Sequence, residues 1–170
     1  MSVVKKANGI ILSNFYSTAI ASASSTADTK TTVVGISGNT FKNGDIITVS
    51  TGCYNDPGVN GWNVSFYWNT ANTLTNAIKI STIRVGSGND YCQFSRLYYI
   101  SDSTGAGDGT DGLNANSSST YAYENSGSVL VNVATNYALD WTKDCYVMTA
   151  LSSDVGPATM YSYWLKVTTF

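Results

Sequence analysis

The densest group of potential metal ligands in this sequence is the run from Asp102 to Gly112, which reads DSTGAGDGTDG. Calcium binds several carboxylate and carbonyl oxygens on a bendable backbone, and alternating Asp and Gly supply both. The run lacks the spacing and the terminal Glu of an EF-hand loop, and it is too short for an array of calcium-binding nonapeptides. A solvated or partner-packed loop is the simpler interpretation, and a calcium site is the alternative.

Catalytic residue types are scarce. The chain has no His and a single Glu, Glu124, so no imidazole can activate a Ser or Cys nucleophile, and no G-x-S-x-G pattern is present. Asp140 and Asp144 flank Trp141, and paired carboxylates beside an aromatic ring occur in sugar-cleaving sites. Here they bracket a turn, where Asp side chains commonly accept hydrogen bonds from the backbone. We therefore expect a non-enzymatic protein with no catalytic residue and no cofactor.

The three cysteines, Cys53, Cys92 and Cys145, are widely spaced. No C-x-x-C pair and no His is available to complete a zinc site, so we expect no metal centre. Buried free thiols are the simpler interpretation, because Cys often packs as a small apolar residue. One disulfide with one remaining thiol is the alternative. Free thiols fit assembly in a reducing host cytoplasm.

Aromatic side chains form the most extensive candidate surface. Tyr and Trp favour protein interfaces, and they also stack on sugar rings, so the sequence predicts a subunit interface or a glycan platform. Neighbouring residues of a strand point to opposite faces, so an adjacent Tyr pair cannot lie entirely in the core. The candidates are Tyr98, Tyr99, Tyr121, Tyr123, Tyr161, Tyr163 and Trp164.

The elements that must position these residues are strands. Trp62, Val64, Phe66 and Trp68 alternate with polar or amphipathic residues, and the same period of two recurs at 129–133 and at Tyr161, Tyr163, Leu165 and Val167. Further runs at 31–37, 45–50, 77–85, 93–100 and 145–151 bring the total to eight or nine. The sequence predicts an all-β fold, an antiparallel jelly-roll-like sandwich with under about 10% helix.

Three segments depart from simple strand alternation. In 77–85 the apolar face changes parity between Ile80 and Ile83, which predicts a bulge or a strand buried on both faces. Residues 70–77 could form one helical turn at most, and Ser101–Ser119 has the composition of a loop.

The N-terminus is expected to be an assembly arm. Residues 1–30 end in an Ala/Ser/Thr-rich stretch, and residues 31–170 contain the sandwich. Apolar anchors in the arm are Ile10, Ile11, Leu12, Phe15 and Tyr16, which we expect to pack on a neighbouring subunit. Polar residues interrupt any signal-peptide core, and no run approaches the ~18 apolar residues of a membrane helix.

The charge composition indicates which classes of binding partner to expect. The formal net charge is -2 and only 12% of residues are charged. This balance carries no electrostatic signature for nucleic acid or for an anionic membrane, so neither is expected as a partner. Sparse surface charge instead favours contacts with other protein chains.

Two segments resemble a known group. GDIITV at residues 44–49 and LDWTKDCYV at residues 139–147 are similar to a "gDtItv" strand and a late "D-x-T-x-D-x-Y" strand of small β-sandwich virion proteins of tailed bacteriophages, whose jelly-roll domains look like those of C1q and TNF. The resemblance covers roughly residues 31–170. It implies a capsid decoration (cement) protein in the virion, in most cases a homotrimer that contacts other virion proteins. The alternative is a tail-fibre or spike module that binds a host-surface glycan.

Overall fold

Eleven strands make up the described part of this computed structural model, and every strand pairing in it is antiparallel. The structure describes residues 2–6, 9–22, 26–42, 45–55, 61–85, 91–102, 111–116, 135–154 and 158–169. The strands are β1 (Ser2–Lys6), β2 (Gly9–Ser22), β3 (Thr29–Ile36), β4 (Ile46–Asn55), β5 (Trp62–Asn69), β6 (Ile78–Val85), β7 (Tyr91–Asp102), β8 (Asp111–Asn116), β9 (Thr135–Leu139), β10 (Cys145–Ser153) and β11 (Met160–Thr169). Within these ranges there is no helix, so none that could cross a membrane.

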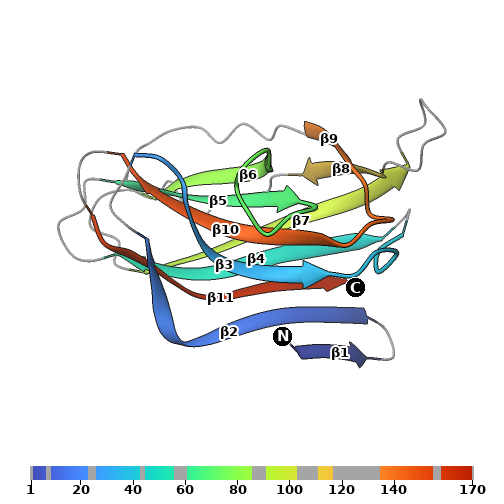
Figure 1. The fold of residues 1–170 in the computed structure, drawn as a ribbon, viewed down its shortest axis with the longest axis horizontal. Helices are drawn as coiled ribbons and strands as arrows, with labels where there is room; N and C mark the ends of the chain where they lie inside the picture. The colour runs from blue at the N-terminus through green and yellow to red at the C-terminus, as the bar shows by residue number, and fades with distance from the viewer. Residues whose placement is uncertain are drawn as a thin grey trace.

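The strands form two sheets that pack face to face. One sheet has the order β1-β2-β11-β4-β7-β8-β9, and the other has the order β3-β10-β5-β6 (Figure 1). Without β1, β8 and β9, eight strands remain, which can be numbered one to eight along the chain. The larger sheet then has the order 1-8-3-6 (β2-β11-β4-β7), and the smaller sheet has the order 2-7-4-5 (β3-β10-β5-β6). This crossing-over between sheets is the jelly-roll arrangement, so the predicted all-β, jelly-roll-like sandwich is confirmed.

The alternation of β5 shows why the core lies between the sheets. Trp62, Val64 and Phe66 are fully buried, whereas Asn63 and Tyr67 on the other face of the strand are only half-buried. Ser65, also on that other face, is fully buried, and its hydroxyl is hydrogen-bonded to that of Thr82 on β6. Phe66 stacks on Phe94 of β7 in the opposite sheet, with ring centroids 4.6 Å apart. Period-two apolar residues therefore turn one face of each sheet towards the other, and aromatic rings fill the space between them.

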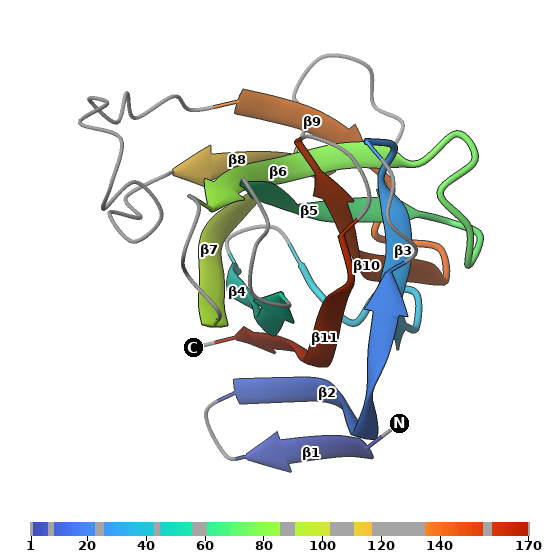
Figure 2. The ribbon, with the colours of Figure 1, turned by 90° about the vertical axis from the view of Figure 1, so that its left-hand side faces the viewer.

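The structure adds strands where the sequence carried no signal. Eleven strands replace the expected eight or nine, partly because β8 and β9 extend the larger sheet next to β7. Strand β8 lies inside the segment expected to be a loop. The apolar pattern did not predict this strand, because backbone pairing with β7 needs no apolar residue. The run at 129–133 lies outside the described residues. Figure 2 shows β8 and β9 at the end of the molecule opposite to the β1–β2 hairpin.

Two local predictions can be checked directly. Phe66 of β5 is opposite Ser81 of β6, but Tyr67 is opposite Lys79, so Ile80 is the additional residue of a bulge and the predicted bulge is confirmed. Residues 70–77 form bends and turns without a helical turn, and Asn76 adopts a left-handed φ of 59° there.

The N-terminal segment differs from the expected arm. Strand β2 pairs with β11 of the same chain, with Leu12 opposite Val167, and thereby belongs to the larger sheet. Leu12 is 3% exposed and lies in the core of its own sandwich, so it is no anchor on a neighbour. The physical reason is that β2 satisfies the backbone groups of β11, which would otherwise form an open edge. Ile10, Ile11, Phe15 and Tyr16 are β2 residues whose side chains lie outside the described part.

Candidate binding face

A row of tyrosines crosses three neighbouring strands on the outer side of the larger sheet. Tyr54 of β4 lies opposite both Tyr91 of β7 and Tyr161 of β11. Cys53 and Met160, their sequence neighbours, are fully buried in the core, so alternation turns the tyrosines outwards. The rings of Tyr54 and Tyr161 have centroids 5.8 Å apart, and Tyr91 is 57% exposed.

Trp164 extends this row by lying over a glycine. Gly52 is opposite Trp164 in the β4–β11 register. A Cβ at Gly52 would meet Nε1 of Trp164 and would lie 2.8 Å from its Cε2 and 3.0 Å from the Tyr91 hydroxyl oxygen. The missing side chain therefore makes the space in which the indole and the phenol approach each other. Tyr54, Tyr91, Tyr161 and Trp164 together are called the aromatic face below.

A bulge in β11 places the indole there. Ser162 is opposite Cys53 and Trp164 is opposite Gly52, which leaves Tyr163 as the additional residue. Without the bulge, Trp164 would point into the core and Leu165 would point outwards. The Thr51 hydroxyl donates to the Trp164 carbonyl oxygen at 2.7 Å, which satisfies a backbone acceptor at the irregularity.

Exposed apolar side chains gather on the same sheet. In the part of the chain that the structure describes, four large apolar residues are exposed: Ile46 (41%), Tyr91 (57%), Leu97 (39%) and Tyr163 (38%). All four belong to β4, β7 or β11, which are adjacent strands of the larger sheet. Tyr91 and Tyr163 lie at the aromatic face, and Ile46 and Leu97 lie further along β4 and β7. Single exposed apolar residues are normal on any protein, but their restriction to one sheet marks a surface that something covers.

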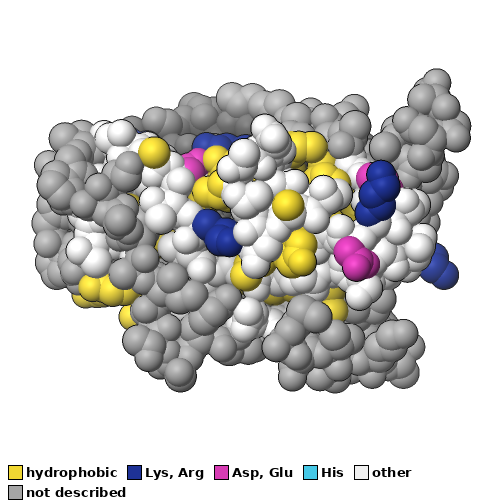
Figure 3. Space-filling model, in the orientation of Figure 1, with side chains coloured by type: hydrophobic (Ala, Val, Ile, Leu, Met, Phe, Trp, Pro, Cys, Tyr) yellow, Lys and Arg dark blue, Asp and Glu magenta, His cyan; other side chains and the backbone are white. Residues whose placement is uncertain are grey.

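Charge is sparse around the sandwich. Figure 3 shows Lys or Arg and Asp side chains as a few small patches among the uncharged side chains of the described residues on the face in view. On β7, Gln93 and Ser95 between Tyr91 and Leu97 are polar but uncharged, and the Ser50 and Ser95 hydroxyls lie 2.9 Å apart. Lys166 of β11, opposite Ser50, is the charged residue of this row. Such a surface favours packing and hydrogen bonding over attraction of charged partners.

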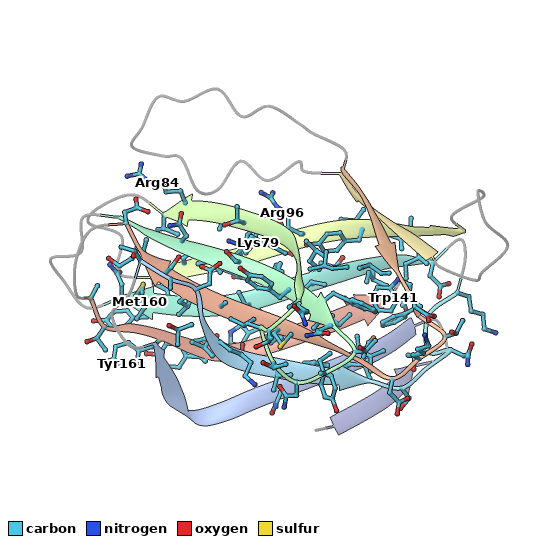
Figure 4. All side chains as sticks on the ribbon, turned by 45° about the horizontal axis from the view of Figure 1, so that its top comes forward. Lys79, Arg84, Arg96, Trp141, Met160 and Tyr161 are labelled. Carbon is cyan, nitrogen blue, oxygen red and sulfur yellow. The ribbon has the colours of Figure 1, made fainter. Side chains whose placement is uncertain are left out.

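The predicted aromatic candidates divide into three groups. Tyr161, Tyr163 and Trp164 lie on or beside the aromatic face. Figure 4 shows Tyr161 at the end of the sandwich opposite to buried Trp141. Tyr98 is fully buried, so it is a core residue and no part of an exposed platform, because β7 alternates and its even positions face the other sheet. The Tyr99 side chain lies outside the described part, as do Tyr121 and Tyr123 entirely.

Sequence reasoning missed Tyr54 and Tyr91. Each follows or precedes a cysteine in an ordinary strand, and only the pairing of β4 with β7 and β11 brings them together. It also assigned Tyr161, Tyr163, Leu165 and Val167 to one face. The bulge separates them, leaving Leu165 and Val167 fully buried. Gly52 within an apolar strand was the available signal, since a strand glycine often marks a bulge or a close approach.

The candidate carboxylates serve the backbone. Asp140 accepts hydrogen bonds from Thr142 N at 3.0 Å and forms an ion pair with Lys143 at 2.8 Å, while Asp144 accepts from Gly38 N at 2.9 Å. The predicted turn-capping role is therefore observed. Strand β7 ends at Asp102 and pairs there with Asp111 of β8, so the Asp/Gly run joins a hairpin, and residues 103–110 lie outside the described part. Among the described residues, no Cys, Asp or Glu cluster could hold a metal.

A groove of about 330 Å³ lies beside strand β3, away from the aromatic face. Asn14 of β2 contributes to its lining, and its amide donates to the Val33 carbonyl oxygen at 3.0 Å. Gly35 lies opposite Tyr146 in the β3–β10 register, and Ser37 and Asp144 add a hydroxyl and a carboxylate. An aromatic ring beside amide, hydroxyl and carboxylate groups has the chemistry to contact a sugar.

Comparison with known proteins assigns no family to this chain. No protein-family model and no curated protein matches the chain. Among solved structures, the chain is similar to an uncharacterized protein from Mycobacterium paratuberculosis, at 10% identity over 94% of this chain and 81% of that chain, with a TM-score of 0.34.

Proposed function

We propose that this protein is a non-enzymatic structural component of a bacteriophage virion, a capsid decoration protein that assembles with copies of itself through the aromatic face. The observation that carries the self-assembly is the gathering of exposed apolar residues on β4, β7 and β11. The virion setting rests on the resemblance of residues 44–49 and 139–147 to phage jelly-roll proteins, and the jelly-roll strand order supports it.

The occupant of the aromatic face is a second copy of this chain. Rigid, half-polar Tyr and Trp side chains are enriched in protein interfaces, because they bury a large area while losing little conformational entropy. The rings of Tyr54 and Tyr161 already pack on each other, and the Trp164 indole lies over Gly52, so these side chains lose little freedom when a partner covers them. An assembly with closed rotational symmetry stops at a fixed number of copies, and the resemblance implies that this number is three.

A double substitution tests this assembly. In Tyr91→Ser/Leu97→Ser, two residues that are 57% and 39% exposed in the single chain become small and polar. Because neither is a core residue, the folded chain should persist while association weakens. Native mass spectrometry should give a three-chain mass for the unaltered protein and a one-chain mass for the variant.

The matched control is Tyr146→Ser on the four-stranded sheet, which removes a half-buried tyrosine away from the aromatic face and should leave the three-chain mass unchanged. A one-chain mass for the unaltered protein at every concentration would refute self-assembly. The virion role is tested separately: antibodies against the chain should label intact phage particles, and labelled lysate free of labelled particles would contradict it.

Carbohydrate binding is the second candidate function, and the groove lined by Gly35, Asp144 and Tyr146 favours it. A glycan array probed with the unaltered protein, Tyr146→Ser and Tyr91→Ser/Leu97→Ser separates the alternatives. Loss of a signal only in Tyr146→Ser would assign a glycan to the groove. Loss only in the double variant would make the aromatic face a glycan platform. No signal from the unaltered protein leaves the structural role as the supported function.

A further inference from the structure

Cys53 of β4 and Cys92 of β7 lie directly opposite each other across two hydrogen-bonded strands. Their neighbours Tyr54 and Tyr91 form the next pair in the same register and point to the outer face. Alternation therefore turns both thiols to the inner side of the sheet, directly beneath the tyrosine row.

This arrangement satisfies the main geometric requirement for a disulfide. Opposed residues of an antiparallel pair have Cα atoms about 4.5 or 5.5 Å apart, depending on whether the pair is hydrogen-bonded. Disulfides span Cα separations of roughly 4.4–6.8 Å, so either type of pair qualifies. Both thiols are free in the structure, and Cys145, the third cysteine, lies on β10 in the opposite sheet.

We propose that Cys53 and Cys92 form a reversible disulfide that links β4 to β7 beneath the aromatic face, and that Cys145 remains a free thiol. The link does not depend on what covers that face. It holds together two of the three strands that carry the face, and thereby restricts the separation of Tyr54 from Tyr91.

The reaction requires a disulfide oxidant, for which oxidised glutathione serves. The Cys92 thiolate attacks one glutathione sulfur and displaces a glutathione thiolate, giving a mixed disulfide. The Cys53 thiolate then attacks the Cys92 sulfur and displaces the second glutathione. The two cysteines lose two protons and two electrons in total, and the glutathione disulfide is reduced to two thiols.

Burial determines the order and the speed of these steps. Cys92 is half-buried and Cys53 is fully buried, so the oxidant reaches Cys92 first. Burial raises the pKa of Cys92 to about 11 and the pKa of Cys53 to about 12. Few thiolates are therefore present at neutral pH, and the disulfide should form slowly in the folded protein and faster as the pH rises.

The test is oxidation of the folded chain with a glutathione redox buffer, followed by alkylation and peptide mapping. The expected product is one Cys53–Cys92 linked peptide, with Cys145 alkylated. The melting temperature should rise by roughly 4–16 °C on oxidation, as for a typical disulfide in a chain of this size. Reduction should reverse both changes.

Two variants control the assignment. Cys145→Ser should still form the link and show the rise in melting temperature, whereas Cys92→Ser, at a half-buried position, should show neither. A linked peptide that contains Cys145 would overturn the proposal. So would alkylation of both Cys53 and Cys92 after prolonged oxidation of the folded protein, or a link that forms only in denaturant.

Discussion

Asp28 connects the start of β3 to the outer side of the four-stranded sheet. Its carboxylate forms an ion pair with Lys79 of β6 at 2.5 Å and accepts a hydrogen bond from the Tyr67 hydroxyl of β5. Burial alone would raise the pKa of Asp28, but the Lys79 ammonium and the hydroxyls of Tyr67 and Ser152 outweigh it and hold that pKa below its ordinary value. These groups tie together strands β3, β10, β5 and β6.

The depressed pKa of Asp28 predicts a dependence of stability on pH. A carboxyl group with a lower pKa in the folded state stabilises the protein above its unfolded pKa, about 4, and that contribution is lost as pH falls through the folded pKa. Urea unfolding should show Asp28→Asn to be less stable than the unaltered protein at pH 6, with the difference shrinking below about pH 4.

Lys79→Met and the double variant complete a mutant cycle for this ion pair. The coupling between Asp28 and Lys79 should be favourable at pH 6 and should vanish in acid. A coupling that does not change with pH would show that the contact contributes through packing rather than charge. Because Lys79 is 45% exposed, solvent screening keeps the expected coupling small.

At the scale of elements, β2 completes the larger sheet of its own chain. It pairs with β11 from Met160 to Thr168 and places Leu12 in the core, while β1 lies outside it at the edge. The small Ala, Ser and Thr residues of this region indicated a linker from the sequence, because they bury little area. Backbone pairing depends only weakly on side-chain size, and it made the segment a strand.

Truncations distinguish the two strands of this hairpin. Deleting residues 2–22 should expose the β11 edge and remove Leu12 from the core. The free energy of unfolding should fall by at least as much as for a buried Leu→Ala change, which costs about 2–5 kcal/mol. Deleting residues 2–8 removes only β1 and should cost much less. Equal urea midpoints for the longer deletion and the intact chain would show that β2 contributes nothing to its own sandwich.

At the scale of the molecule, the two sheets share one core. The stacked rings of Phe66 and Phe94 join β5 to β7 across the sandwich, and Trp141 packs edge-on against both Phe41 and Trp68. A chain with few charges and a continuous aromatic core should unfold as a unit.

Phe66→Ala tests this unity. Removing a fully buried ring that spans the sheets should lower the free energy of unfolding by about 3–5 kcal/mol, and tryptophan fluorescence and circular dichroism should report the same midpoint. Gln93→Ala at an exposed position of β7 is the control and should change stability by less than about 0.5 kcal/mol. Separate midpoints for the two signals would mean that the sheets unfold independently.

The fold class could be predicted from the sequence because strand alternation is a local pattern. Trp62, Val64 and Phe66 indicate a buried face whichever strand theirs pairs with. The bulge at Ile80 could be predicted for the same reason, since a change of parity is visible within a few residues. The aromatic face could not be predicted in this way. Tyr54, Tyr91 and Trp164 come together only through the pairing of distant strands, and the β11 bulge turns Trp164 outwards. Register between strands is a property of the whole sheet, so it is decided by tertiary structure, and with it the opposition of Cys53 and Cys92.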